Sequence, residues 1–269
     1  MTSFEPAVLP ASYVTASSEA VAAFAAAHYD LGGLPVCTLL NRGFNDAYAL
    51  RTDTGEHFVL RLSGRRARGP ADVAAETAFL AYPERNGALF TTALLPDGPH
   101  AAVLFRYAEG RRPDLDAPED ARAQGVTLAR LHQVAAGFPD RDAGRYRLDL
   151  DHLLHRQVAA VLALDLDAQQ ARRNLSAFAA RLADTVGRID PELTRTRCHG
   201  DCHGLNARIA TSGLHVGQTV FFDFDDGGYG YLAYDLAVHL WAQVSFGRCQ
   251  YRLNPPQKRR LKVPRFIAF

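Results

Sequence analysis

Short stretches of alternating apolar and polar residues fill much of the first hundred positions, and this period of two predicts β-strands. Turn-forming residues lie between them, at Asp53-Thr54-Gly55 and at Pro96-Asp97-Gly98-Pro99. Helical spacing appears at residues 17–28 and again from residue 70. The pattern therefore predicts a mostly antiparallel sheet with one inserted helix. The expected strands are residues 36–40, 47–51, 57–62, 90–95 and 101–107.

A polar segment with Gly and Pro at residues 108–113 ends this pattern, and helical spacing dominates after it. We therefore predict an α+β fold with two lobes. The expected parts are an N-terminal lobe (residues 1–107), a hinge (108–113), a helical C-terminal lobe (114–246) and an atypical basic tail (247–269). Within the second lobe, the expected helices are 121–131, 150–164, 168–189 and 232–241, and the expected short strands are 195–199, 207–210 and 216–222.

The run from His199 to Asn206, HGDCHGLN, has the H-x-D-x-x-x-x-N spacing of a kinase catalytic loop. Asp223 follows the second strand of a hairpin that returns the chain to the end of this loop. In phosphoryl transfer, Asp201 would orient the acceptor hydroxyl and take its proton, while Asn206 and Asp223 would hold Mg²⁺ against the nucleotide phosphates. The spacing therefore predicts an ATP-dependent kinase, and an acidic surface loop is the alternative.

The same run offers the ligand types of a zinc site, at Cys198, His199, Cys202 and His203. All four lie within six residues, whereas structural zinc usually takes its ligand pairs from separate segments. We therefore favour a structural imidazole at His199 that braces the loop. Cys202 and His203 are expected to fill the loop or to line the acceptor side.

Arg61 lies in the middle of a predicted strand, from which its side chain would reach the α- and β-phosphates of a nucleotide. Glu76, on the following helix, would pair with Arg61 and fix its direction. The alternative is a solvated strand residue paired with a helix acid. The loop at residues 41–46 lies where a kinase has a phosphate-covering loop. Backbone amides near Gly43 and the side chain of Asn45 would therefore contact phosphate. The alternative is an ordinary hairpin loop.

Two further acidic residues are expected to support the site, and a histidine is expected to have a structural role only. Asp225 lies two residues after the predicted metal ligand and would act on the metal from outside its ligand set. Asp235, near the start of a helix, is expected to hold the catalytic loop by hydrogen bonds. His132 is expected to be a packed helix-end residue that is satisfied by a nearby carbonyl.

Composition narrows the possible partners. The formal net charge is +1 and 48% of residues are hydrophobic, which predicts an ordinary globular chain with no nucleic-acid or membrane partner. Four cysteines without disulfide-scaffold spacing, no apparent signal peptide and no apolar run long enough to span a bilayer together favour the cytoplasm. No oligomeric state follows from these features.

Three motifs, HGDCHGLN, VFFDFDD and YLAYDLAVHLW, resemble those of the aminoglycoside phosphotransferase/choline kinase-like superfamily. The segments FNDAY and DFDD are similar to those of its homoserine kinase-like and stress-response kinase-like branches. The N-terminal motifs RGFNDAYAL, HFVLRLS, AAETAFL, VLFRYAEG and LARLH occur in the same order. The resemblance runs from about residue 30 to Trp241. It implies a bilobal protein-kinase-like fold, ATP and Mg²⁺ as cofactors, and a small-molecule hydroxyl as acceptor. It also implies an adenine-facing segment from Phe105 to Gly110, which includes Tyr107.

The end of the chain departs from this resemblance. Superfamily members continue for several helices after the segment that resembles YLAYDLAVHLW, whereas this chain leaves the pattern near Gly247 and has no Asp or Glu after Asp235. We therefore expect an apparently truncated C-terminal lobe, exposed apolar surface and weak stability. Two alternatives to a small-molecule kinase stay open: a Ser/Thr protein kinase of the stress-response type, and an inactive nucleotide-binding remnant.

Overall fold

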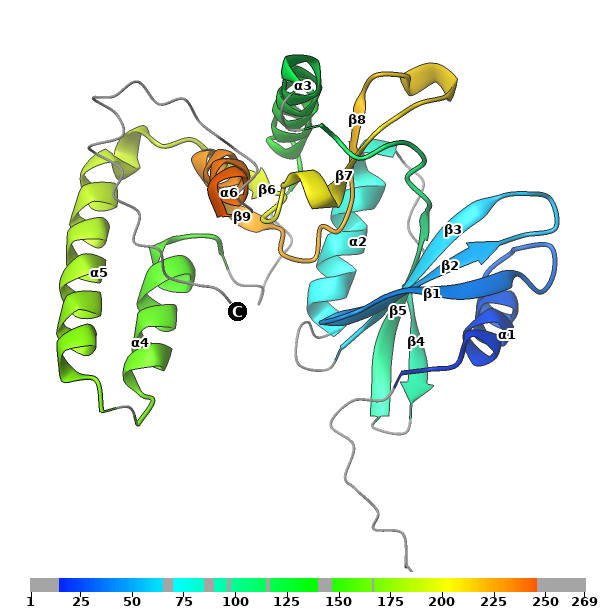
Figure 1. The fold of residues 1–269 in the computed structure, drawn as a ribbon, viewed down its shortest axis with the longest axis horizontal. Helices are drawn as coiled ribbons and strands as arrows, with labels where there is room; N and C mark the ends of the chain where they lie inside the picture. Colours follow the sequence, from blue (N-terminus) through cyan, green and yellow to red (C-terminus); the bar gives the residue numbers. More distant parts are fainter. Residues whose placement is uncertain are drawn as a thin grey trace, which may run out of the picture.

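The structure is a computed structural model that describes residues 15–64, 70–84, 90–95, 98–114, 117–139, 147–165 and 167–245. The expected basic tail at 247–269 and the departure near Gly247 lie outside the described residues, as do Pro96 and Asp97 of the predicted turn. A sheet with two helices lies on one side of the molecule, and a mostly helical region (residues 117–245) lies on the other (Figure 1).

The N-terminal part is a five-stranded antiparallel sheet, as the alternating pattern predicted. Its strand order is β1-β2-β3-β5-β4, so the last two strands along the chain pair as a hairpin at one edge. The strands are β1 (Val36–Arg42), β2 (Asn45–Arg51), β3 (His57–Ser63), β4 (Phe90–Leu95) and β5 (Gly98–Arg106).

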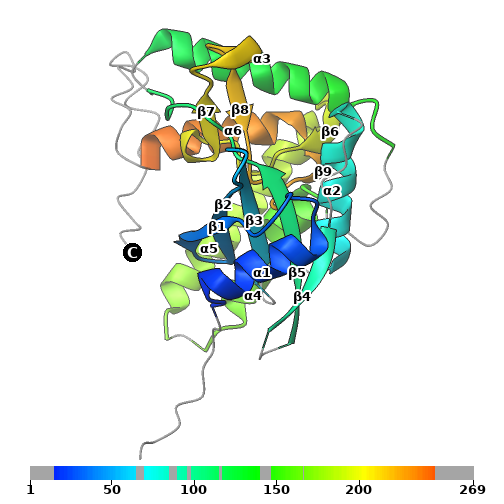
Figure 2. The ribbon, with the colours of Figure 1, turned by 90° about the vertical axis from the view of Figure 1, so that its right-hand side faces the viewer.

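Helices cover both faces of this sheet, α1 (Ser18–His28) on one face and α2 (Pro70–Glu84) on the other (Figures 1 and 2). Alternation along β3 and β5 decides which side chains meet which helix. On one face, the sheet residues Tyr48, Leu50, Leu60, Leu62 and Ala102 pack against Val21 and Ala25 of α1. On the other face, Ala101, Val103 and Phe105 of β5 pack against Val73 of α2. Since Leu60 and Leu62 face α1, Arg61 between them must face α2.

The helical region contains α3 (Pro118–Ala135), α4 (Arg156–Leu162), α5 (Gln169–Ile189) and α6 (Leu232–Ser245). The predicted helix at 150–164 is divided, because its first turn is a π-type turn, η1 (Asp151–His155). No helix in the described part of the chain is both long and apolar enough to cross a bilayer.

Two small antiparallel sheets carry the loops of interest. One pairs β6 (Arg195–Cys198) with β9 (Gly228–Tyr231), and the other pairs β7 (Ala207–Ile209) with β8 (Thr219–Phe221). The second sheet is the predicted hairpin, but the expected strand at 216–222 is shorter. Gly217 has a φ of 77° and its N–H donates to the Ala210 carbonyl at 2.9 Å, so the chain is still turning there. The sequence pattern did not predict β9, a glycine-rich GYGY segment that becomes a strand by pairing with β6.

The segment predicted as a hinge is tied to the second sheet. Arg111 and Ile209 exchange backbone hydrogen bonds of 3.0 and 2.8 Å. Gly110 has a φ of 137°, and a Cβ there would lie 2.2 Å from the Ile209 carbonyl oxygen, so a glycine is required. The boundaries predicted for the lobes stay predictions.

Candidate active site

The loop after β6 brings two of the predicted polar side chains together. The Asn206 Nδ2 donates to the Asp201 backbone oxygen at 3.1 Å and to the Asp201 Oδ2 at 2.8 Å. A short 3-10 turn, η3 (Gly204–Asn206), makes this possible, and the His203 Nδ1 caps it by accepting from the Leu205 N–H at 3.2 Å. The Asp201 side chain keeps a third of its surface exposed. It is therefore held by the loop and still open to a substrate.

His199 is fully buried and links this loop to the strand that leads to Asp223. Its Nδ1 accepts from the Asp201 N–H at 3.2 Å, so the proton lies on Nε2, which donates to the Phe222 carbonyl at 3.1 Å. Burial lowers the pKa of the imidazole, and this effect exceeds that of nearby Asp235, which raises it. The imidazole is therefore neutral. The ring also packs 4.2 Å from the ring of Phe224. These contacts place His199 as a brace of the loop.

Asp235, at the start of α6, is completely buried beneath the same loop. Its carboxylate accepts from the His199 N–H at 2.9 Å, from the Gly200 N–H at 2.8 Å and from the His132 Nε2 at 2.8 Å. Burial by itself raises the pKa of Asp235, but these three donors outweigh it and hold the pKa below its ordinary value. Asp235 thus forms hydrogen bonds to the loop, as its predicted supporting role requires. His132 is buried in the last turn of α3, as expected, but the expected partner was wrong, because it is this carboxylate and not a carbonyl.

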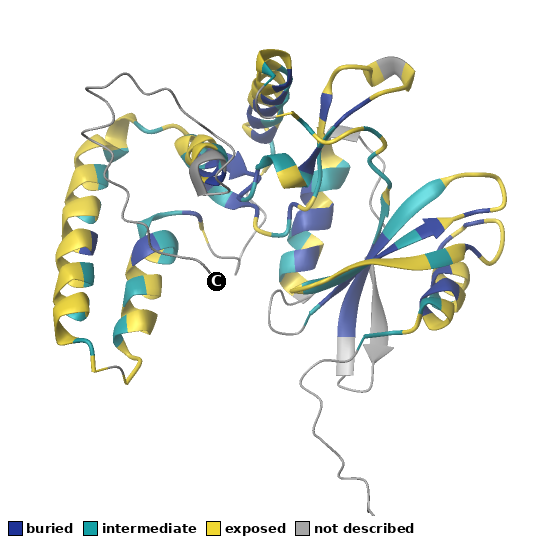
Figure 3. Ribbon diagram, in the orientation of Figure 1, coloured by how far each residue is buried: buried dark blue, intermediate teal, exposed yellow. Residues whose placement is uncertain are grey.

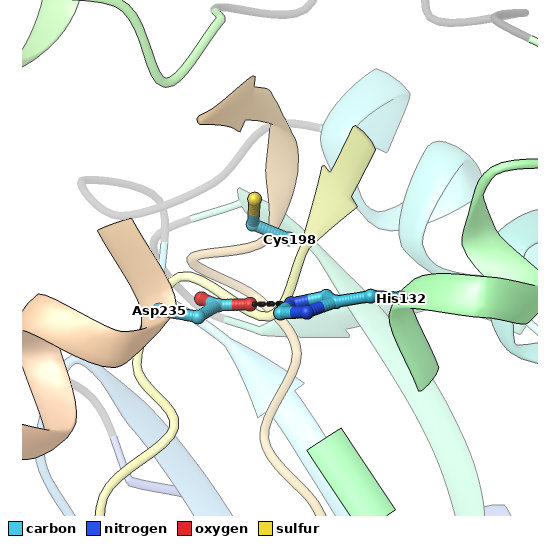
Figure 4. A group of neighbouring side chains, drawn as sticks. All are labelled: His132, Cys198 and Asp235. Carbon is cyan, nitrogen blue, oxygen red and sulfur yellow. Dashed lines mark hydrogen bonds and ion pairs between the residues drawn. The ribbon is translucent and has the colours of Figure 1, made fainter. Parts of the chain in front are cut away.

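Three buried residues from three elements, His132, Cys198 and Asp235, form a group of metal-ligand type in the described part of the chain (Figure 4). It is not the Cys/His run considered from the sequence. His132 is bonded to Asp235, while the Cys198 sulfur points away from that pair and donates to the Tyr231 carbonyl at 3.3 Å. Burial raises the pKa of the Cys198 thiol, which disfavours the thiolate that a metal would need. The three side chains are better explained by their hydrogen bonds than by a metal.

Asp223 lies just after β8, at the mouth of the β7–β8 hairpin. The Phe222 N–H donates to the Asn206 carbonyl at 3.1 Å, so the hairpin closes next to Asn206. Among the described residues, Asp223 is the one non-glycine residue with a positive φ, 65°, a conformation that a side chain makes unfavourable. Desolvation, followed by the nearby charge of Asp225, raises the pKa of Asp223 to about 7, while Arg61 opposes the rise. Accumulated negative charge of this kind favours a bound cation.

Arg61 and Glu76 form a buried two-bond ion pair between β3 and α2. The Arg61 NH1 donates to the Glu76 Oε1 at 3.0 Å, and its NH2 donates to the Glu76 Oε2. The Arg61 NH1 also lies 3.4 Å from the Asp223 Oδ1. Burial would lower the pKa of Arg61, but Glu76, with smaller effects of Asp225 and Asp223, raises it. The guanidinium is therefore a fixed cation beside Asp223, where the sequence predicted a phosphate contact.

Gly43 lies in the β1–β2 turn and Asn45 is the first residue of β2, and their described contacts are with protein. The Asn45 Nδ2 donates to the Asp225 Oδ2 at 2.7 Å, which joins the sheet to the segment after β8. The Gly43 N–H donates to the Asn45 carbonyl at 3.2 Å inside the hairpin. The predicted contacts of both residues with phosphate stay predictions.

Phe105 and Tyr107 lie at the end of β5, next to the segment that leads into the helical region. The Arg61 guanidinium carbon lies 5.2 Å from the centre of the Phe105 ring. Tyr107 stacks on His57 with ring centres 3.8 Å apart. The adenine contact implied by the resemblance stays a prediction for both residues.

One buried cation was not predicted from the sequence. Arg197, on β6 just before the catalytic loop, is 3% exposed and its guanidinium carbon lies 4.9 Å from the ring centre of Phe79 on α2 and 5.6 Å from that of Phe138. Its NH2 donates to the Ala75 carbonyl at 3.4 Å, beside Glu76. Arg197 therefore joins the strand before the loop to the helix that carries Glu76. Nothing in its position along the chain indicated this, because the contact depends on how the two regions pack.

A cavity of about 450 Å³ lies against Asp201 on the side toward α6. Polar and aromatic side chains contribute to its wall, and most of them lie within the three motifs HGDCHGLN, VFFDFDD and YLAYDLAVHLW. The cavity is lined by Leu148, His152, Leu153, Gly200, Asp201, Asp226, Tyr234, Ala237, Val238 and Trp241.

The donor set fits a hard divalent cation. Because the Asn206 Nδ2 donates to Asp201, the amide oxygen of Asn206 lies at the other end of the group and is placed to act as a ligand. The Asp223 carboxylate supplies a second oxygen from the adjoining hairpin end, and oxygen ligands are those that Mg²⁺ prefers. Arg61 beside them adds a positive charge for phosphate oxygens. Together these groups can bind and neutralise a metal-bound polyphosphate.

Comparison with known proteins agrees with this geometry. The model of the phosphotransferase enzyme family matches residues 36–253. The chain belongs to the phosphotransferase enzyme family. An uncharacterized protein of Deinococcus radiodurans is 35% identical over 266 residues, which cover 94% of this chain and 75% of that protein.

Solved structures of low sequence identity share the fold of this family member. Amicoumacin kinase in complex with AMP-PNP, Ca²⁺ and Ami has a TM-score of 0.61 and 18% identity. The match covers 80% of this chain and 66% of the amicoumacin kinase chain, which is slightly less than two thirds of the length of that kinase. Aminoglycoside 2'-phosphotransferase-IIIa, solved as a GDP complex, has a TM-score of 0.56 and 20% identity, over 77% and 72%. The predicted superfamily, the kinase-like α+β fold and the phosphotransferase class of enzyme are thus confirmed.

Proposed function

We propose that this phosphotransferase transfers the γ-phosphoryl group of ATP, bound with Mg²⁺, to a hydroxyl group of a small molecule. In this proposal Asp201 orients the acceptor hydroxyl and takes its proton, while Asn206 and Asp223 hold the metal. Arg61, directed by Glu76, contacts phosphate, and Gly43, Asn45, Phe105 and Tyr107 lie around the nucleotide. His199, Asp225 and Asp235 support these groups.

The observation that carries the proposal is the position of the Asp201 carboxylate. On one side Asp201 is bonded to Asn206, next to the end of the hairpin that bears Asp223. On the other side it lines the 450 Å³ cavity. A base between a metal site and a cavity is the arrangement that in-line phosphoryl transfer requires, because positioning and charge account for most of its catalysis.

The cavity also favours a small acceptor over a protein. Its volume falls in the range of pockets for small ligands. Two carboxylates, Asp201 and Asp226, and two aromatic residues, Tyr234 and Trp241, contribute to its wall. Such a wall favours an acceptor with several hydroxyl or amino groups, which donate hydrogen bonds to carboxylates and pack against rings. The name of one structural neighbour, amicoumacin kinase, agrees with a small acceptor.

We also propose that the protein is located in the cytoplasm. Cys37, Cys198 and Cys202 are free thiols, which fits a reducing compartment.

The substitution Asp201→Asn tests the proposal. We expect it to lower turnover by at least about 100-fold, since a general base contributes about that much or more. Binding of ATP with Mg²⁺, measured by calorimetry, should survive. Turnover would be followed as ADP release with a panel of small polyols and amino alcohols, with GTP run alongside ATP. The control is Asp184→Asn, the same change on the exposed face of α5.

Two other outcomes would support the alternatives. Incubation of the chain with cell extract and radiolabelled ATP, followed by separation of protein from small molecules, would place the label on polypeptide if the acceptor is a protein. Magnesium-dependent ATP binding with neither hydrolysis nor transfer would identify a nucleotide-binding remnant. Wild-type turnover in Asp201→Asn would refute the assignment of the base.

A further inference from the structure

One hydrogen bond joins the N-terminal sheet to the predicted metal segment across 180 residues of sequence. It runs from the Asn45 Nδ2 to the Asp225 Oδ2 at 2.7 Å, a short bond from an amide to a carboxylate. Asn45 was expected to touch phosphate, yet its side-chain amide is engaged by Asp225. The bond therefore points to a role for Asn45 that its place in the chain did not indicate.

We propose that Asn45 is a positioning residue for the metal. It holds Asp225, and through Asp225 it keeps the segment 223–225 in the conformation in which the Asp223 carboxylate faces the metal and the nucleotide. The inference rests on the proposed function, because it concerns the same metal site.

The sheet side of this bond is rigidly placed. The second polar atom of the amide, Asn45 Oδ1, accepts from the Gly64 N–H at 3.3 Å at the end of β3. The Gly64 N–H also lies 3.2 Å from the Phe44 carbonyl oxygen, and a Cβ on Gly64 would lie 2.2 Å from that oxygen. Asn45 therefore bridges the start of β2 and the end of β3, which pack so closely that only glycine fits at position 64. Because its Oδ1 is held, the Asn45 Nδ2 has little freedom of direction.

The metal side of the bond needs external support. Asp223 has a φ of 65°, and a non-glycine residue keeps such a conformation only where its surroundings hold it. His199 holds the residue before it through the Phe222 carbonyl, and Arg61 contacts the Asp223 side chain. Asn45 holds the residue two positions after it. Removing Asn45 would therefore remove a contact that helps to hold the segment on that side.

The bond also separates the roles of two neighbouring acids. Since the Asn45 amide occupies the Asp225 Oδ2, a metal at this site would have to displace that donor to use the same oxygen. No equivalent amide donor to Asp223 is found among the described residues, where its side chain contacts the Arg61 cation at 3.4 Å. The bond thus favours Asp223 as the metal ligand, while Asp225, with one carboxylate oxygen held by Asn45, orients the segment.

The test is Mn²⁺ affinity, measured by calorimetry with AMP-PNP and without any acceptor. We expect Asn45→Ala to weaken Mn²⁺ binding by about 10- to 100-fold, the usual effect of removing a side chain that orients a metal ligand. In Asn45→Asp two carboxylates would face each other, so affinity should fall at least as far. In the double variant Asn45→Asp/Asp225→Asn the bond is restored with its direction reversed and the net charge unchanged. We expect that variant to recover affinity to within about threefold of the wild type.

Several outcomes would overturn the inference, and they are distinguishable from failure of the proposed function. Unchanged affinity in Asn45→Ala, or a double variant as weak as Asn45→Asp, overturns the inference alone. If the wild-type chain binds no Mn²⁺–AMP-PNP, the proposed function fails and the inference fails with it. Asp223→Asn, which should abolish Mn²⁺ binding, shows that the signal comes from this site. Should Asn45→Ala not fold, the comparison of Asn45→Asp with the double variant still decides.

Discussion

The two ends of the molecule are packed very differently (Figure 3). In the N-terminal sheet, Tyr48, Leu50 and Leu60 have no exposed surface. At the opposite end, α5 has one buried residue, Ala179, among its 21, and α4 has none. Apolar side chains are also exposed on α6, where Leu240 is 50% and Trp241 59% exposed.

In the proposed function, this difference would separate the proposed phosphate contact of Arg61 from acceptor recognition. Arg61 lies between two buried leucines of β3, so the cation that would contact phosphate is held by the core. The cavity beside Asp201 is partly walled by α6, whose outer residues are exposed. A densely packed region holds its side chains in one arrangement and resists substitution, whereas a thinly packed wall tolerates substitutions that would change which acceptor binds.

The largest effect should separate the two regions directly. Leu60→Ala removes a fully buried side chain and should lower the free energy of unfolding by about 3–5 kcal/mol, through lost transfer energy and a cavity. The same change at Leu182, on the half-exposed face of α5, should cost less than about 1 kcal/mol. Urea denaturation followed by circular dichroism would measure both. Equal losses in the two variants would show that α5 is packed as firmly as the sheet.

A smaller effect concerns pH and the buried loop between the two regions. Burial lowers the pKa of His199 below 6.5, so the unfolded chain takes up a proton near that pH while the folded chain does not. Stability should therefore fall as the pH decreases below 6.5, by up to about 1.4 kcal/mol per pH unit from this residue. His239, whose pKa is also lowered by burial, adds to the loss in the same range.

His199→Gln keeps a donor for the Phe222 carbonyl and removes the titration, so it should flatten the dependence of Tm on pH between 6.5 and 5. His155→Gln, at an exposed position of η1, is the matched control and should leave the dependence as it is. An unchanged slope in His199→Gln would mean that other groups cause the loss of stability.

The smallest effect tests whether the thinly packed helix α5 unfolds together with α3. Gly187 in α5 and Gly125 in α3 lie inside helices, and a Cβ at either position would meet no atom within 4 Å. Alanine should stabilise each helix by about 0.5–1 kcal/mol. We expect Gly125→Ala to raise the main thermal transition and Gly187→Ala to slow hydrogen exchange mainly within α4 and α5. If both variants shift one common transition equally, α3 and α5 unfold as a single unit.

Local patterns were enough to predict most of the architecture. Alternation located the five strands of the sheet, and the spacing of apolar residues located its helices and those of the helical region, because both patterns report which face of an element is buried. The expected start of α1 at residue 17 agrees with its cap, since the Ser17 Oγ accepts from the Ala20 N–H at 3.2 Å. The errors occur where local signals are weak. β9 has two glycines in four residues, and it forms because β6 lies beside it.

The site divides in the same way. The spacing of a kinase-like loop is visible in the sequence, so its residues alone pointed to Asp201, Asn206 and Asp223. Partners from distant segments had no such signal. The carboxylate partner of His132 lies 103 residues away, and Arg197 reaches α2 over 122 residues.

By itself, the sequence determined the class of chemistry, because phosphoryl transfer needs particular side chains at short, recognisable spacings along one loop and one hairpin. Only the tertiary structure decided how those side chains are held and what they face. It joined Asn45 to Asp225, buried Asp235 under the loop at residues 199–206 and placed a cavity against Asp201. Such contacts depend on the packing of elements far apart in the chain, and the pattern of residues within each element does not encode that packing.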